Sequence, residues 1–139
     1  MILDSTILVK IVVNELGSKE AATSVATLLK RGSGLHTVDL AMAECLNAIW
    51  KHTNLHKDLS IEDGKAAIQD LKKVYDRLPV FTARELTEEA FDISLNHNMA
   101  VYDALYIAAA HKTDATLYTA DRKLHEKATK IIRSRLLKT

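Results

Sequence analysis

The chain is poor in the residues that cross-link a protein or interrupt its secondary structure. Its 139 residues include one cysteine, one proline and four glycines. So few prolines and glycines argue against a turn-rich β-sandwich or barrel. The lone Cys45 excludes an internal disulfide and is compatible with a reducing compartment.

Long apolar runs are also missing. No stretch approaches the roughly 18 apolar residues of a membrane-spanning helix, and no signal peptide precedes Asp4. We therefore expect a cytoplasmic protein with no membrane partner.

The overall composition is that of a folded protein, but its charge is unevenly distributed. Apolar residues make up 47% and charged residues 27% of the chain, and its length suits one domain over residues 1–139. Residues 122–139 hold seven of the 19 Lys and Arg residues but only one of the 18 Asp and Glu residues. This basic end suits contact with a polyanion; the alternative is a solvated terminal helix.

The first six residues, Met1-Ile-Leu-Asp4-Ser5-Thr6, organise the rest of the chain. A short apolar run before an acid is typical of a strand buried on both faces of a parallel sheet. Asp4 would then lie at the carboxyl end of a central strand, where open α/β sheets bind ligands. It would also lie at the amino end of the next helix, which favours negative charge.

Short strands and longer helices are expected to alternate along the chain. Apolar runs and capping signals predict strands at 1–3, 35–38, 78–81 and 116–119, and helices at 6–14, 18–31, 40–52, 60–75, 82–97, 101–112 and 122–127. The last dozen residues are compatible with either a helix or a terminal strand. The pattern predicts an α/β three-layer sandwich, with a short-stranded parallel central sheet and helices on both faces.

The helix at 40–52 carries two further predictions. Asp39 is placed to cap its amino end. Helical spacing predicts that its inward-facing residues are Leu40, Ala43, Leu46, Ala48 and Trp50.

Four acids occupy unusual positions in this outline. Asp4 and Asp121 follow apolar strands, whereas Glu44 and Asp103 lie within apolar helices that offer no Lys or Arg at i±3 or i±4. Each has a structural explanation when taken alone: Asp4 and Asp121 as helix caps, Glu44 and Asp103 as partners of distant cations. We favour a shared site over four separate explanations. The predicted topology brings the ends of the strands before Asp4 and Asp121 to the same edge of the sheet.

Converging carboxylates need a cation. Two of them about 4 Å apart repel by roughly 4 kcal/mol at an effective dielectric constant of about 20. A ligand set of oxygens alone selects Mg²⁺ or Mn²⁺ over Zn²⁺. Such a site supports hydrolysis of a phosphodiester by a metal-activated water.

Each of the four acids lies in a distinctive segment: the opening hydrophobic-Asp4-Ser5-Thr6, then Ala43-Glu-Cys-Leu-Asn-Ala48, Val101-Tyr-Asp-Ala-Leu-Tyr-Ile-Ala108 and Tyr118-Thr-Ala-Asp-Arg-Lys-Leu124. In these segments the chain resembles the PIN-domain nucleases and, among these, the VapC-type toxins of type II toxin–antitoxin pairs. The likeness spans nearly the whole chain, in order and at the spacing typical of the family. Its most specific parts are the third and fourth segments.

The resemblance implies both a site and a function. The metal-binding and catalytic residues would be Asp4, Glu44, Asp103 and Asp121; supporting residues would be Ser5, Thr6, Asn47 and Thr119. It further implies a Mg²⁺- or Mn²⁺-dependent endoribonuclease, an RNA substrate, a homodimer and a cognate antitoxin protein. A nuclease that processes RNA without being a toxin, or an inactive PIN-like module that binds RNA or protein, are the alternatives.

Several other side chains have two interpretations each. Arg122 and Lys123 follow the fourth acid, where they would contact RNA phosphate or simply face solvent. His52 and His56 have the i, i+4 spacing of a metal pair, but no third ligand accompanies them. The aromatic residues Trp50, Tyr102 and Tyr106 are expected in the core or a dimer interface, and Cys45 in the core.

Overall fold

The structure is a computed structural model that describes residues 1–139. Strands β1 (Ile2–Leu3), β4 (Leu117–Thr119) and β5 (Ser134–Leu136) pair in parallel in that order, and β2 (Thr37–Val38) pairs in parallel with β3 (Val80–Phe81). A parallel bridge from Ile2 to His36 joins the two groups of strands. The strands therefore run across the molecule as β3-β2-β1-β4-β5.

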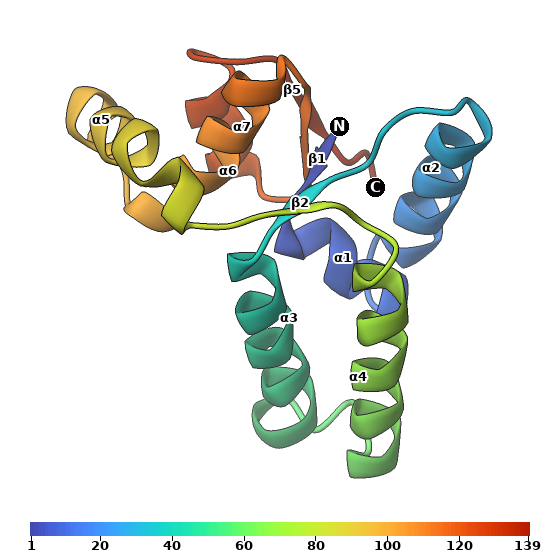
Figure 1. Cartoon of the computed structure of the whole chain (residues 1–139). Coiled ribbons are helices and arrows are strands. Elements are labelled where there is room, and N and C mark those ends of the chain that lie inside the picture. The colour runs from blue at the N-terminus through green and yellow to red at the C-terminus, as the bar shows by residue number, and fades with distance from the viewer.

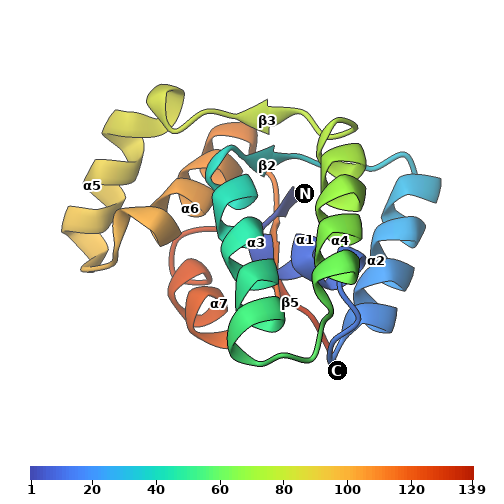
Figure 2. The ribbon, with the colours of Figure 1, turned by 90° about the horizontal axis from the view of Figure 1, so that it is seen from below.

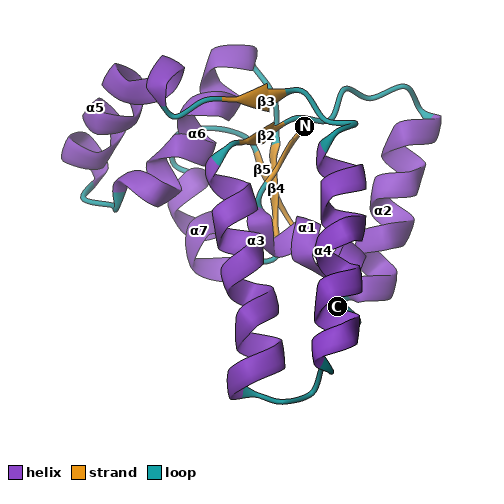
Figure 3. Cartoon of the chain, turned by 60° about the horizontal axis from the view of Figure 1, so that its bottom comes forward, coloured by secondary structure: helices purple, strands orange, loops and turns teal.

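Helices cover both faces of this sheet (Figures 1 and 3). One side carries α1 (Ser5–Val12), α2 (Ser18–Lys30), α3 (Leu40–Trp50) and α4 (Ile61–Tyr75), and the other carries α5 (Thr87–His97), α6 (Val101–Thr113) and α7 (Arg122–Ala128). Short π-helical and 3₁₀ segments occupy Lys51–Leu55 and Arg84–Leu86. The predicted three-layer α/β sandwich is confirmed.

The core lies where the strands meet α1 and α6. It is a cluster of 31 buried apolar residues, to which α6 contributes seven consecutive positions, Ala104 to Ala110. Helices α3 and α4 run side by side and extend away from the sheet (Figures 1 and 2). None of the helices has the length and apolar character needed to cross a membrane.

Capping chemistry places several helix boundaries where the sequence predicts them. The Ser60 hydroxyl accepts from the Asp63 N–H at 3.0 Å, and Thr82 and Glu85 form a reciprocal capping box. Asn98 ends α5 in the left-handed conformation, with φ of 50°. The ambiguous final residues form a strand, β5, on the edge of the sheet.

Two predictions about α3 are wrong. Asp39 does not cap the helix, because its carboxylate accepts instead from the Ala83 N–H at 3.1 Å and so ties the end of β2 to the chain after β3. The buried face of α3 is Ala41, Cys45 and Ile49, whereas Leu46 and Trp50 are 39% and 50% exposed. Leu46 and Trp50 instead line an open groove between α3 and α4.

Candidate acidic active site

The candidate site lies at the point where the winding of the sheet reverses. From β1 the chain moves outward through β2 to β3, then crosses to β4 and continues to β5. Because β1 and β4 are adjacent and parallel, Asp4 after β1 and Asp121 after β4 lie at the same edge. Open α/β sheets bind ligands at this position.

Asp4 is the most buried of the four acids, at 2% exposure. Its carboxylate accepts hydrogen bonds from the Thr6 hydroxyl at 2.6 Å, the Ile7 N–H at 3.2 Å and the Thr119 hydroxyl. Burial raises the pKa of Asp4 to about 6; the hydrogen bonds lower it, and the charge of Glu44 adds to the rise. This carboxylate is therefore desolvated and has no basic partner.

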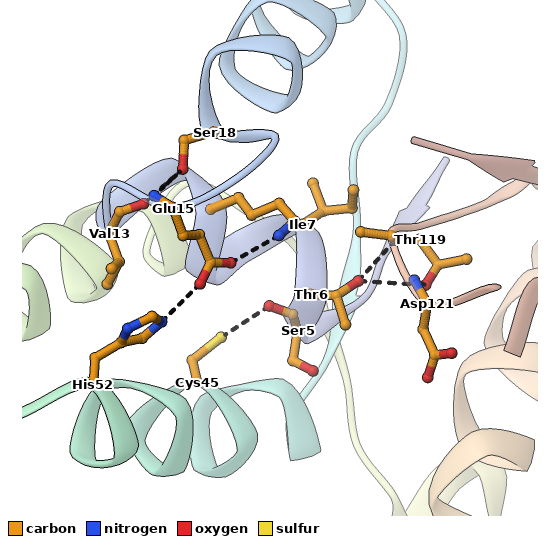
Figure 4. A network of polar contacts seen from close by, with 12 residues as sticks. Ser5, Thr6, Ile7, Val13, Glu15, Ser18, Cys45, His52, Thr119 and Asp121 are labelled. Carbon is orange, nitrogen blue, oxygen red and sulfur yellow. Dashed lines mark hydrogen bonds and ion pairs between the residues drawn. The ribbon is translucent and has the colours of Figure 1, made fainter. Parts of the chain in front are cut away.

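Two threonine hydroxyls join Asp4 to Asp121. Thr119 is fully buried, and its hydroxyl donates to Asp4 and accepts from the Asp121 N–H at 2.9 Å. The Thr6 hydroxyl likewise accepts from the Ala120 N–H at 2.8 Å. Figure 4 shows Thr6, Thr119 and Asp121 side by side, with the Asp121 carboxylate pointing away from both hydroxyls. The hydroxyls thus fix the spacing of the two strand ends.

Asp121 also caps α7. Its Oδ1 accepts from the Lys123 N–H at 2.9 Å and the Leu124 N–H at 3.2 Å. The prediction that Asp121 caps the following helix is therefore confirmed. Its Oδ2 makes no hydrogen bond within the protein. One oxygen therefore serves the helix while the other remains available to a ligand.

Glu44 enters the site from α3 and is satisfied by a phenol. The Tyr106 hydroxyl donates to Glu44 Oε1 at 2.6 Å. Burial raises the pKa of Tyr106, and the charge of Glu44 raises it further. The Tyr106 ring is core, as predicted, but its hydroxyl positions a site residue. A buried tyrosine hydroxyl needs a hydrogen-bond acceptor. A tyrosine and an acid that both lie in apolar helices, as Tyr106 and Glu44 do, are the sequence signal that could have indicated this pair.

Asp103, in the first turn of α6, has a basic partner. Lys127 Nζ on α7 lies 3.4 Å from Asp103 Oδ2. The alternative prediction for Asp103, that it pairs with a basic residue distant in sequence, is therefore correct. Sequence spacing could not show it, because α6 and α7 are brought together only by the strand between them.

The remaining predicted residues are less involved. Ser5 is half-buried and its carbonyl accepts from Cys45 Sγ at 3.6 Å, while Asn47 is exposed and makes no side-chain hydrogen bond. Arg122 and Lys123 are exposed and form no ion pair. Cys45 is buried as predicted; burial, with the charges of Asp4 and Glu44, raises the pKa of its thiol to about 12.

The donor chemistry of the site fits a hard divalent cation. No three His, Cys, Asp or Glu side chains are gathered as they would be around a metal. Yet all the candidate donors are oxygens, Asp4 is desolvated without a basic partner, and Glu44 Oε2, Asp103 Oδ1 and Asp121 Oδ2 are unbonded. These unbonded carboxylate oxygens are of the ligand type that Mg²⁺ and Mn²⁺ prefer.

A second polar cluster lies apart from the acids and includes one of the predicted histidines. His52 Nε2 is 2.7 Å from Glu15 (Figure 4). Its Nδ1 is 2.9 Å from Asp58. Both ring nitrogens are therefore engaged by carboxylates, and His56 only meets the His52 ring edge-on, with 5.8 Å between centroids. The histidine pair forms no metal site in this structure.

Comparison with known proteins identifies the family. The PIN domain model matches residues 1–130. The chain belongs to the PIN-domain family. The resemblance inferred from its four acidic segments is confirmed.

Relatives of this PIN domain are found among both sequences and solved structures. It is 34% identical to Ribonuclease VapC3 of Pyrobaculum aerophilum over 128 aligned residues. The alignment covers 91% of this chain and 93% of that protein. It resembles the crystal structure of PAE2754 from Pyrobaculum aerophilum with a TM-score of 0.69, at 26% identity over 96% of this chain and 88% of the other. VapBC2 from Rickettsia felis, solved bound to a promoter DNA fragment, shares the fold with a TM-score of 0.70 at 15% identity, over 99% and 98% of the two chains.

Proposed function

We propose that this PIN domain is a Mg²⁺- or Mn²⁺-dependent endoribonuclease and the toxin of a toxin–antitoxin pair. The observation that carries the proposal is the buried Asp4, held by Thr119 beside Asp121 at the reversal point of the sheet. Similarity to Ribonuclease VapC3 supports RNA as the substrate. We further propose that residues 1–139 form one nuclease domain that works in the cytoplasm.

In the proposed reaction, Asp4, Glu44, Asp103 and Asp121 would hold the cation. When bound, the cation would supply Lewis-acid stabilisation of the phosphodiester and a water of lowered pKa. Hydrolysis without a covalent enzyme intermediate would leave a 5′-phosphate and a 3′-hydroxyl.

The chain's own groups prepare this site before substrate arrives. The Thr6 and Thr119 hydroxyls and the Ile7 N–H donate to Asp4, which favours and orients its ionised form. The Tyr106 hydroxyl fixes Glu44. Arg122 and Lys123, exposed in the first turn of α7, would contact the RNA phosphates.

Partners are proposed on the same basis. The likeness to Ribonuclease VapC3 and to VapBC2 supports a cognate antitoxin, and we propose a homodimer as well. Two large side chains are exposed on helices that carry site residues: Trp50 at 50% at the end of α3, and Tyr102 at 64% on α6 next to Asp103. Placed at the surface rather than in the core, they suit contact with another protein.

The decisive experiment is cleavage of a mixed RNA pool by purified protein in Mg²⁺, in Mn²⁺ and in chelator. Asp103→Asn should lower the rate about 100-fold or more, because it removes a charge that holds the cation. The matched control is Asp92→Asn, an exposed acid on α5 with no partner, which should cleave normally. Cleavage that survives both chelator and Asp103→Asn would contradict the proposal.

One observation favours an inactive binding module instead, namely that the four acids are bonded within the protein and not gathered around a common point. That function predicts metal-independent RNA binding, with no turnover at any Mg²⁺ or Mn²⁺ concentration. The same RNA pool tests it directly.

A further inference from the structure

The ion pair between Lys127 and Asp103 distinguishes Asp103 from the other three acids. Asp4 is bonded to hydroxyls and an N–H, Glu44 to a phenol, and Asp121 to backbone N–H groups, all of them neutral donors. Only Asp103 meets a formal positive charge, at 3.4 Å from Lys127 Nζ. Lys127 is thus the single basic side chain paired with any of the four acids.

The position of Lys127 follows from α7. Asp121 caps the amino end of this helix and Lys127 lies in its last turn, roughly 9 Å further along the axis. The helix therefore supplies one acid of the site and the counter-charge of another. The side chains of Lys127 and Asp103 are 43% and 32% exposed, so the pair is partly open to solvent rather than buried in the core.

We propose that Lys127 is the resident counter-ion of the acidic site: its ammonium holds Asp103 until a divalent cation displaces it. This inference rests on the proposed metal-dependent function. Because Asp103 Oδ2 faces Lys127, a cation must either share this carboxylate with an ammonium of like charge or take it away. Lys127 is a positioning residue that acts through Asp103, and it sets the cation concentration at which the site fills.

The test is Mn²⁺ binding to the full chain without RNA, measured from the free Mn²⁺ signal in electron paramagnetic resonance, with Mg²⁺ titration calorimetry in parallel. Lys127→Met should bind Mn²⁺ about three- to tenfold more tightly, because a like charge beside the ligand is removed. Lys127→Arg keeps the charge and should bind like the unmodified chain.

Two controls separate this effect from general charge or folding effects. Lys130→Met removes the same charge from an exposed residue three positions away that pairs with no acid, and should leave Mn²⁺ affinity unchanged. In an Asp103→Asn background, Lys127→Met should have little further effect, as a double-mutant cycle requires if Lys127 acts through Asp103. Lys127→Met should also melt lower in chelator and gain more from Mn²⁺.

The outcomes are distinct. Unchanged or weaker Mn²⁺ binding by folded Lys127→Met, when the unmodified chain binds Mn²⁺, would overturn the role of Lys127 and leave the nuclease proposal intact. Absence of Mn²⁺ and Mg²⁺ binding by the unmodified chain would overturn the metal-dependent function, and this inference with it.

Discussion

Asp4 is the residue at which the proposed function and stability conflict most directly. Burial raises its pKa to about 6, against an unfolded value of 3.8. Between these values the folded chain holds a proton that the unfolded chain has lost, so the free energy of unfolding falls as the pH rises through this range. At neutral pH the ionised carboxylate costs up to about 3 kcal/mol of stability.

Asp4→Asn should therefore stabilise the metal-free protein while abolishing cleavage. In chelator at pH 7.5 we expect its free energy of unfolding to exceed that of the unmodified chain by about 1 to 3 kcal/mol, because Asn is neutral and nearly isosteric. Urea denaturation across pH 4 to 8 measures the difference, which should shrink toward pH 4. A variant less stable at pH 7.5 would show that the hydrogen bonds to Asp4 outweigh its burial.

At the scale of elements, His52 connects three segments that the sheet does not organise. It lies in the π-helical turn after α3 and meets Glu15 from the α1–α2 connection and Asp58 from the chain leading to α4. Burial lowers the pKa of His52, but hydrogen bonds to Asp58 and Glu15 and their charges leave it raised overall. The ring thus ties the connection between α3 and α4 to the connection between α1 and α2, in a cluster where Lys10 of α1 also bonds Glu15 at 2.9 Å.

His52→Gln should destabilise the chain in a pH-dependent way. A histidine whose folded pKa is raised contributes stability below its unfolded pKa of about 6.5 and loses it as the pH rises through the folded value. We expect a loss of about 1 kcal/mol at pH 6 and a smaller loss at pH 8.5. His97→Gln, an exposed histidine with no partner, is the control. Equal losses at both pH values would mean that packing, not charge, is what His52 supplies.

Across the whole molecule, the basic residues are concentrated at the end of the chain, and the fold places this end on the same side of the sheet as Asp121. Residues 122–139, with seven basic residues and one acid, begin directly after Asp121, the fourth acid of the site. They form α7 and β5, on the β4 side of the sheet where Asp121 lies. An RNA strand drawn to this basic end would therefore approach the candidate site.

Removing Arg122 and Lys123 together should weaken RNA binding and its salt dependence. If each contacts one phosphate of single-stranded RNA, the double alanine variant should reduce the slope of log K against log salt by about 1.4. Fluorescence anisotropy in an Asp103→Asn background measures binding without cleavage. Lys72→Ala with Lys73→Ala, exposed on α4, removes the same charge elsewhere and should leave the slope nearly unchanged.

Most of the architecture was predictable from local features. Buried strands are read from short apolar runs, and helix ends from residues such as Ser60, Thr82 and Asn98, because capping and backbone conformation act within a few positions. The prediction failed for Asp39 and for the exposed side of α3. Both depend on which element lies next to the residue in space, a fact that local spacing does not contain.

The sequence by itself determined the α/β class, the positions of the four acids and the membership of the PIN-domain family. Only the tertiary structure decided the partners of those acids: Thr119 for Asp4, Tyr106 for Glu44 and Lys127 for Asp103. The physical reason is the distance along the chain over which each interaction acts. Propensity and capping energies are set by neighbours in sequence, whereas a buried carboxylate takes its partner from whichever element the sheet brings against it.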